Sequence, residues 1–283
     1  MNKVNFFGHE VSKLIIGDNP ISGHSYIKRY ISDQEMIDYH TTENILKTLF
    51  TMEKYGYNTM LPLADPFMIR ILKEYEMSGG KLKYIFQPYM PMDQEVSMRQ
   101  MMSLNGTIGI YHQGTTTDYL FETNQTEEIK ERIKLYRTMG VPVGLGSHRP
   151  PHIEICEREE WDIDFYMACM YNSRRNREGE KSGFLTGKDK IGVLFHENDR
   201  PYMLDVLKDI TKPIIAFKIF AGGQMFIGKT PEEKKALIKD AYNTIFTSLK
   251  PDDFAAVGVF QRDFDQLKEN LEIYDEWYSE VNL

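Results

Sequence analysis

The sequence has 283 residues and a net charge of −8, with 41% hydrophobic and 27% charged residues. This length and balance are typical of a globular chain with one large core, and the acidic excess gives no electrostatic support to nucleic-acid binding. Two cysteines are too few for a disulfide framework. No apolar run approaches the roughly 18 residues of a membrane span, and no signal-peptide pattern opens the chain, so we expect a cytoplasmic protein.

Short apolar runs alternate with amphipathic segments along the chain, which predicts strand–helix units and a parallel sheet. In chain order, the predicted strands are 13–19, 57–63, 82–89, 107–112, 141–148, 162–171, 213–220 and 254–260. The helices that follow them are 42–54, 66–77, 95–104, 126–139, 151–159, 200–210, 231–249 and 263–278. Eight units favour a closed (β/α)8 TIM barrel of the α/β class over an open sheet, and we expect residues 1–283 to form one domain.

Two loops are longer than a minimal barrel needs, 20–40 after the first strand and 172–199 after the sixth. Both would lie on the catalytic face, where loops carry binding residues. The second loop contains Arg174 in a basic cluster together with several glycines, which permits two interpretations. It is either a lid that closes over an anionic or polyhydroxy substrate or a solvated surface insertion. Glycines 56, 80 and 140 are expected to end helices.

In such a barrel, the residues at the strand C-termini converge on one site. Polar and ionisable residues occupy these positions after six of the eight predicted strands. The candidates are Asp18, Asn19, His24, Gln87, His112, Asp118, His148, Tyr171, Asn172, Arg174, Lys218, Gly222 and Gly223. The Gly222-Gly223 pair follows the seventh strand, where backbone N–H groups often bind phosphate, although a flexible turn fits these residues equally well.

Four of these candidates, His112, His148, Lys218 and Asp18, are predicted to carry the chemistry. Alternation along 108–112, 144–148 and 214–218 predicts that His112, His148 and Lys218 face inward. Desolvation would lower the pKa of Lys218 and suit it to acid–base or Schiff-base work, and an ion pair with Asp18 is the alternative. Neutral imidazoles suit proton transfer or metal ligation. Together with Asp18 they could form a two-histidine, one-carboxylate set, but tight ligand spacing is absent and no metal is assigned.

Several segments resemble the aldo/keto reductase superfamily of barrels. They are IIGDNPISG, IGIYHQGTTTDYL, VPVGLGSHRPPHIEICEREEWDIDFYMACMYN, FKIFAGGQM and VGVFQRDFDQLKENLEIYDEW. The resemblance implies a nicotinamide-dependent barrel whose catalytic set is an aspartate, a tyrosine, a lysine and a histidine. Only His112 matches this set, since Leu61 stands at the aspartate position, with Asp65 as a displaced candidate, and Gln87 replaces the lysine. The chain therefore resembles a bacterial branch of that superfamily that lacks most of the tetrad.

The leading hypothesis is an isomerase- or lyase-type enzyme of carbohydrate metabolism that acts on a small polar, sugar-like or carbonyl-bearing substrate. His112 and His148 would serve as acid and base, Lys218 and Asp18 would complete the catalytic group, and the remaining candidates would bind substrate. An NADP-dependent oxidoreductase and a non-catalytic barrel that binds a ligand or partner are the alternatives. The cofactor is unassigned. The expected partner is a small molecule rather than a nucleic acid or a membrane, and the sequence permits an oligomer.

Overall fold

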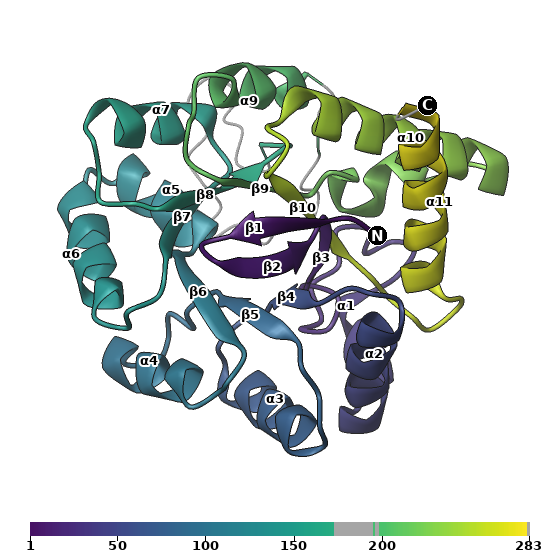
Figure 1. Ribbon diagram of the computed structural model, residues 1–283, viewed down its shortest axis with the longest axis horizontal. Coiled ribbons are helices and arrows are strands. Elements are labelled where there is room, and N and C mark those ends of the chain that lie inside the picture. The colour runs from purple at the N-terminus through teal and green to yellow at the C-terminus, as the bar shows by residue number, and fades with distance from the viewer. Residues whose placement is uncertain (173–194, 196–197, 282–283) are drawn as a thin grey trace.

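A computed structural model describes residues 1–172, 195 and 198–281. Its parallel strands are Leu14–Gly17 (β3), Thr59–Leu61 (β4), Lys83–Phe86 (β5), Thr107–His112 (β6), Val143–Ser147 (β7), Phe165–Cys169 (β8), Ile214–Phe217 (β9) and Phe254–Gly258 (β10). Each strand pairs with the next one, and β10 pairs with β3 to close the barrel (Figure 1). Every predicted strand range contains one of these strands, so the predicted (β/α)8 barrel is confirmed.

The helices form a ring around the barrel (Figure 1). They are Asp33–Tyr39 (α1), Thr42–Lys54 (α2), Pro66–Met77 (α3), Gln94–Met102 (α4), Gly114–Glu122 (α5), Thr126–Arg137 (α6), Pro150–Arg158 (α7), Asp199–Leu207 (α9), Pro231–Ser248 (α10) and Gln266–Val281 (α11), with a 3-10 segment, Ala221–Phe226 (η1). The sequence did not predict α1, α5 or η1. The three lie in loops on the catalytic side, where local polar residues obscure the helical period.

Local chemistry fixes where several helices begin and end. The Asp65 side chain accepts hydrogen bonds from the first backbone N–H groups of α3, and Thr230 and Glu233 form a reciprocal capping box at the start of α10. After α3, the residue with positive φ is Gly79, at 93°, rather than the predicted Gly80. Gly80 is instead required by close packing, because a Cβ at this position would lie 2.2 Å from the ring of Tyr75 in α3.

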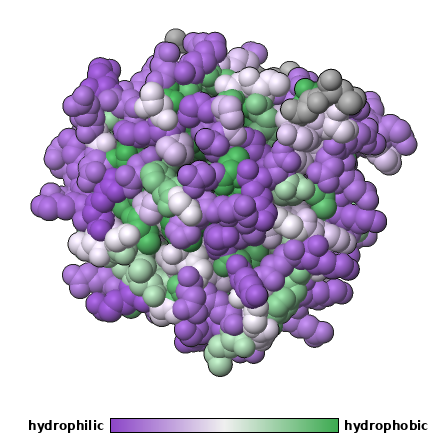
Figure 2. All heavy atoms as spheres, in the orientation of Figure 1, coloured by the Kyte–Doolittle hydropathy of each residue, from purple (hydrophilic) through white to green (hydrophobic). Residues whose placement is uncertain are grey.

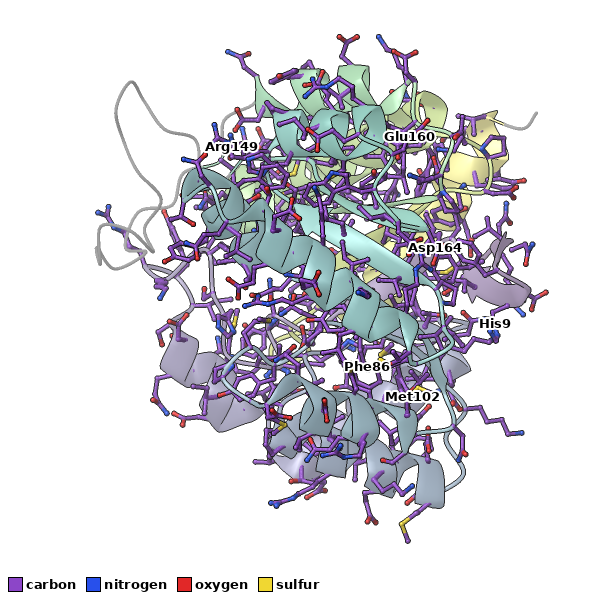
Figure 3. All side chains as sticks on the ribbon, turned by 90° about the vertical axis from the view of Figure 1, so that its left-hand side faces the viewer. His9, Phe86, Met102, Arg149, Glu160 and Asp164 are labelled. Carbon is purple, nitrogen blue, oxygen red and sulfur yellow. The ribbon has the colours of Figure 1, made fainter. Side chains whose placement is uncertain are left out.

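A hairpin that the sequence did not predict closes one end of the barrel. Its strands, Lys3–Phe6 (β1) and His9–Ser12 (β2), lie across the barrel in Figure 1. Phe6 is fully buried, and its ring meets those of Phe165 and Phe254 edge-on at centroid distances of 5.1 and 5.5 Å. The hairpin thus fills the N-terminal opening with apolar side chains, and its outer surface is mainly hydrophilic (Figure 2). The other end is left for the site, as Figure 3 illustrates with His9 and Arg149 at opposite ends.

An irregularity in β6 changes which of its side chains face inward. The pairing of β5 with β6 shifts between Tyr84 and Ile85, as at a β-bulge. Beyond the shift, Tyr111 packs inside the barrel, whereas the residues on either side of it face the helices. The predicted inward face of this strand, positions 108, 110 and 112, is therefore wrong for Ile110 and His112, because one extra residue reverses the alternation.

Across the part of the chain that the structure describes, every helix is too short or too polar to cross a membrane.

We expect Phe6→Ala to lower the free energy of unfolding by about 3–5 kcal/mol, because it empties the closed end of the barrel. Phe7→Ala is the matched control, since Phe7 is 45% exposed, and it should cost less than about 0.5 kcal/mol. Urea unfolding followed by circular dichroism would measure both variants. Equal losses would mean that the hairpin does not stabilise the barrel through Phe6.

Candidate functional site

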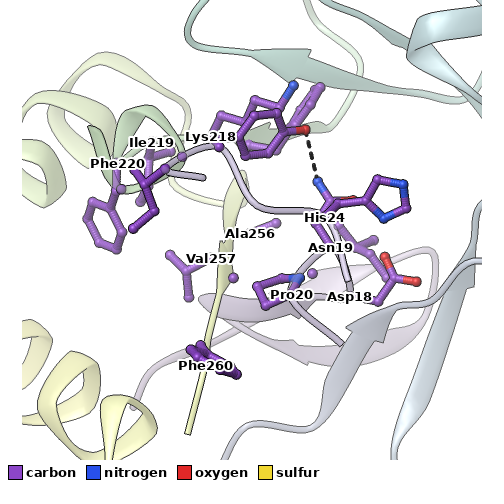
Figure 4. A pocket seen from close by; sticks show the side chains of 18 of the residues that line it. Asp18, Asn19, Pro20, His24, Lys218, Ile219, Phe220, Ala256, Val257 and Phe260 are labelled. Atoms are coloured by element: carbon purple, nitrogen blue, oxygen red, sulfur yellow. Dashed lines mark hydrogen bonds between the residues drawn. The ribbon is translucent and has the colours of Figure 1, made fainter. Parts of the chain in front are cut away.

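A cavity of about 570 Å³ opens at the C-terminal ends of the barrel strands. Eight of the predicted site residues line it: Asp18, Asn19, His24, Gln87, His148, Lys218, Gly222 and Gly223. Figure 4 shows Asp18 and Asn19 at the end of β3, with Lys218 following β9. The loop after β3 and the segments before α10 and α11 form the outer walls of the cavity. Most of the residues that were predicted from their positions at strand ends therefore line one cavity.

His112 is not among the residues that line this cavity. Its Nδ1 lies 2.7 Å from the Thr117 hydroxyl, and its Nε2 lies 3.5 Å from the Arg132 guanidinium. Burial, followed by the charge of Arg132, lowers the pKa of His112 to about 3, so the ring is neutral. The prediction that His112 faces the site is wrong. The bulge in β6 turns it toward α5 and α6 and presents Tyr111 to the cavity instead.

A hydrogen-bonded chain runs from a fully buried carboxylate into the cavity. The Asp118 side chain, from α5, accepts from His148 Nδ1 at 2.8 Å, and Lys218 Nζ lies 2.9 Å from His148 Nε2. An ammonium group has no acceptor, so Nε2 must accept and Nδ1 must carry the proton. Burial opposes ionisation of Asp118, but hydrogen bonds from His148 and His152 outweigh it and hold the pKa of Asp118 well below its usual range. The chain therefore consists of carboxylate, neutral imidazole and ammonium.

Lys218 reaches the cavity through an unusual backbone conformation. Ile215 and Phe217 face the barrel interior, whereas the residue between them faces the helices, so simple alternation would send Lys218 outward. Its φ of 58° lies in the left-handed region, which costs energy for a residue with a side chain, and it redirects the chain at this point. The predicted face of 214–218 is therefore wrong, although Lys218 does line the cavity.

The ammonium of Lys218 lies among aromatic rings, at 4.7 Å from the ring centroid of Tyr26 and 5.6 Å from those of Phe195 and Phe217. Burial disfavours the charged form, but Tyr26, Cys169 and Asp118 outweigh it and raise the pKa of Lys218. The predicted lowering of this pKa is therefore wrong. The alternative ion pair of Lys218 with Asp18 does not form among the described residues, since Lys218 contacts His148 and Asp18 accepts from Leu63 and Ser22.

Asp18 lies on the opposite wall from His148. In the closed barrel, β4, β5 and β6 separate β3 from β7 on one side, and β8, β9 and β10 separate them on the other. The Leu63 N–H and the Ser22 hydroxyl donate to Asp18 Oδ2 at 2.6 and 3.1 Å. Burial raises the pKa of Asp18 from 3.8 to about 6, because these two hydrogen bonds offset the desolvation only in part. This carboxylate is thus ionised at neutral pH and more basic than usual.

Polar groups between the two walls could orient a substrate. The Asn19 amide donates to the Tyr26 hydroxyl at 3.2 Å (Figure 4), and the Tyr111 hydroxyl donates to the Gln87 side-chain oxygen at 3.0 Å. Sequence reasoning did not find the two tyrosines. Tyr111 was hidden by the bulge, which has no signature in the sequence, and Tyr26 could have been found only by treating the whole 20–40 loop as part of the site.

The remaining predicted residues are placed differently. His24 is exposed at the cavity rim, whereas Tyr171 is buried and Asn172 donates its backbone N–H to Asp199 at 3.2 Å. Arg174 and most of the 172–199 loop lie outside the described residues. Gly222 and Gly223 have positive φ, and a Cβ on Gly222 would lie 2.8 Å from Tyr26, so close packing explains this glycine. Among the described residues, no cluster of three potential metal ligands occurs, and the predicted set of Asp18 and two histidines is not assembled.

No protein-family model matches the chain, and no curated protein matches its sequence. Solved structures share its fold. An aldo-keto reductase of Bacillus halodurans is 10% identical, with a TM-score of 0.59 over 99% of this chain and 95% of that one. A truncated 3-deoxy-D-arabino-heptulosonate 7-phosphate synthase of Thermotoga maritima is 10% identical, with a TM-score of 0.54 over 99% and 90%. A dihydropteroate synthase of Xanthomonas albilineans is 11% identical, with a TM-score of 0.53 over 99% and 98%. These likenesses concern the fold alone, since unrelated chemistries share this barrel.

The raised pKa of Asp18 predicts a pH-dependent stability. Because the folded state holds the proton more tightly, the stabilising contribution is fully present below about pH 3.8 and is lost as the pH rises through about 6. Relative to Asp18→Asn, the unchanged protein should lose about 3 kcal/mol of unfolding free energy between about pH 4 and pH 7. Urea titrations at several pH values would measure this difference. Asp205→Asn, at an exposed position, is the control, and parallel curves for the unchanged protein and Asp18→Asn would contradict the prediction.

Proposed function

We propose that the chain is an enzyme that moves protons on a small polar substrate bearing a carbonyl or hydroxyl group, with Asp18 and Lys218 acting in the same cavity from the ends of two different strands. The observation that carries this proposal is the Asp118–His148–Lys218 chain, with links of 2.8 and 2.9 Å, which ends in a cavity that also contains the basic carboxylate of Asp18. A proton acceptor and a proton donor in one cavity suit isomerisation, epimerisation or elimination next to a carbonyl. As part of the proposal, residues 1–283 act as one barrel domain.

In the proposed reaction, the Asp18 carboxylate takes a proton from the carbon next to the carbonyl. The electrons of the broken C–H bond form the enolate double bond, and the negative charge moves to the carbonyl oxygen. The Lys218 ammonium donates to that oxygen as the charge develops. In an isomerisation, Lys218 transfers its proton to that oxygen and then takes up the proton of the hydroxyl on the deprotonated carbon, whose electrons form the new carbonyl, while Asp18 returns its proton to the former carbonyl carbon. In this scheme, His112 and His148 are no longer the acid and the base. His148 instead positions Lys218 through its Nε2.

The polar groups beside these residues favour a hydroxylated, sugar-like substrate. Asn19, Gln87, Tyr26 and Tyr111 offer hydroxyl and amide groups that can donate and accept hydrogen bonds. Such groups hold neutral hydroxyl-rich molecules better than purely apolar ones. This chemistry supports the carbohydrate class that we expected from the sequence.

The aldo/keto reductase resemblance is retained only as a proposal about ancestry. Of the catalytic set that it implies, His112 alone matches in sequence, and its side chain packs against α6 rather than in the cavity. Because the residues of the cavity do not match that reductase set, the proposed reaction uses no nicotinamide cofactor.

We expect Lys218→Met and His148→Gln each to reduce turnover at least about a hundredfold, because they remove the donor that stabilises the developing charge or the group that orients it. A thermal-shift screen of small hydroxycarbonyl compounds would identify ligands. NMR in D2O would then measure deuterium exchange at the carbon next to the carbonyl, which needs no knowledge of the product.

Two exposed positions give matched controls, His9→Gln and Lys229→Met, and both should exchange at the unchanged rate. Exchange that persists in Lys218→Met would remove this lysine from the mechanism. Ligands that bind without any exchange would favour the alternative of a non-catalytic binding barrel.

For the oxidoreductase alternative, we expect no quenching of tryptophan fluorescence and no enhancement of NADPH emission at millimolar NADPH. The physical reason is the mismatch between the cavity residues and the reductase set. Isothermal titration calorimetry would check the result independently. Saturable binding that Lys218→Met weakens would overturn the proposal in favour of an oxidoreductase.

A further inference from the structure

Asp118 is held from two sides, and only one of them faces the cavity. The residue is fully buried. His148 Nδ1 donates to Oδ2 at 2.8 Å, while His152 Nδ1 lies 3.0 Å from Oδ1 and the Ser147 hydroxyl donates to Oδ1 at 2.7 Å. Each carboxylate oxygen therefore has an imidazole partner. His152 comes from α7, behind the barrel wall, and does not line the main cavity.

The surroundings of His152 fix its ring in one plane. The ring stacks on Phe121, with centroids 4.2 Å apart and planes 8° apart, and Phe121 in turn stacks on Trp161 at 5.6 Å. These three side chains line a second cavity outside the barrel, of about 450 Å³. Such a stack leaves the ring little freedom to rotate, so the direction of its Nδ1 toward Asp118 is set by the packing of α5 against α7.

A buried carboxylate stays charged only if its oxygens are satisfied. The Ser147 hydroxyl also lies 3.1 Å from His152 Nδ1, so it supports the same arrangement. Loss of His152 would remove one of the hydrogen bonds to Oδ1, which keeps the Ser147 hydroxyl at 2.7 Å and the His148 backbone N–H at 3.3 Å, and would make it easier for the carboxyl group to rotate or take up a proton. In either case, His148 Nδ1 would lose its carboxylate acceptor, which favours the Nδ1–H tautomer together with the Lys218 ammonium.

We propose that His152 is a positioning residue of the site, which clamps Asp118 from outside the barrel and thereby keeps His148 Nε2 free to accept from Lys218. The importance of this clamp for turnover rests on the function proposed above. The arrangement itself, two imidazoles that both donate through Nδ1 to one carboxylate, can be tested without a substrate.

Long-range 15N–1H NMR of the full-length, histidine-labelled protein reports the tautomer of each ring. In the unchanged protein, we expect His148 and His152 both to be Nδ1–H tautomers. In His152→Leu, the ratio of Nδ1–H to Nε2–H tautomer at His148 should fall about tenfold, as expected for the loss of one strong hydrogen bond to the carboxylate. His152→Asn, whose amide can donate from a position near that of Nδ1, should restore most of this ratio.

Ile155→Val is the matched control, because Ile155 lines the same second cavity but has no hydrogen-bonding side chain and takes no part in the ring stack. Its tautomer ratio at His148 should stay within about twofold of the original. An Nε2–H tautomer at His152 in the unchanged protein would overturn the proposal even if no variant folds. An unaltered His148 ratio in a folded His152→Leu protein would do the same. A failure of the deuterium-exchange experiment would instead reject the proposed enzyme function and leave the tautomer result standing.

Discussion

The ionised carboxylate of Asp118 is the feature on which the site depends. A charge this deeply buried is stable only with several donors around it, and here the donors are Ser147 at the end of β7, His148 directly after it and His152 in α7. The same hydrogen bonds align His148 with Lys218, so the requirement to satisfy a charge behind the barrel wall also orients an ammonium group in the cavity. Packing between helices and strands thus has a direct chemical consequence at the strand ends.

Closure of the barrel imposes the second constraint. Strands of different lengths must meet in register around the circle, and the irregular pairing of β5 with β6 is where this barrel departs from simple alternation. That departure exchanges a histidine for a tyrosine at the cavity wall. At the other end, the N-terminal hairpin supplies apolar side chains that the short strands do not, and it leaves a single open face for the site.

Two groups of opposite charge face the cavity. One is a carboxylate that burial makes more basic, and the other is an ammonium whose neighbours favour its charge. Such a pair can accept a proton from carbon and stabilise the resulting oxyanion without a large change in the environment. The left-handed backbone conformation of Lys218 agrees with a role in the site, because strained backbone conformations cluster at functional sites.

Periodicity alone determined the barrel, since eight apolar runs each followed by an amphipathic segment leave few other ways to bury both kinds of face. It also placed Asp18, His148 and Lys218 at strand ends, and these three line the cavity. The tertiary structure decided the rest. A bulge reversed the side of His112, a positive φ turned Lys218 inward, and helix packing brought Asp118 beneath His148. These outcomes depend on strand register and on contacts between residues distant in sequence, which a local pattern of hydrophobicity does not encode.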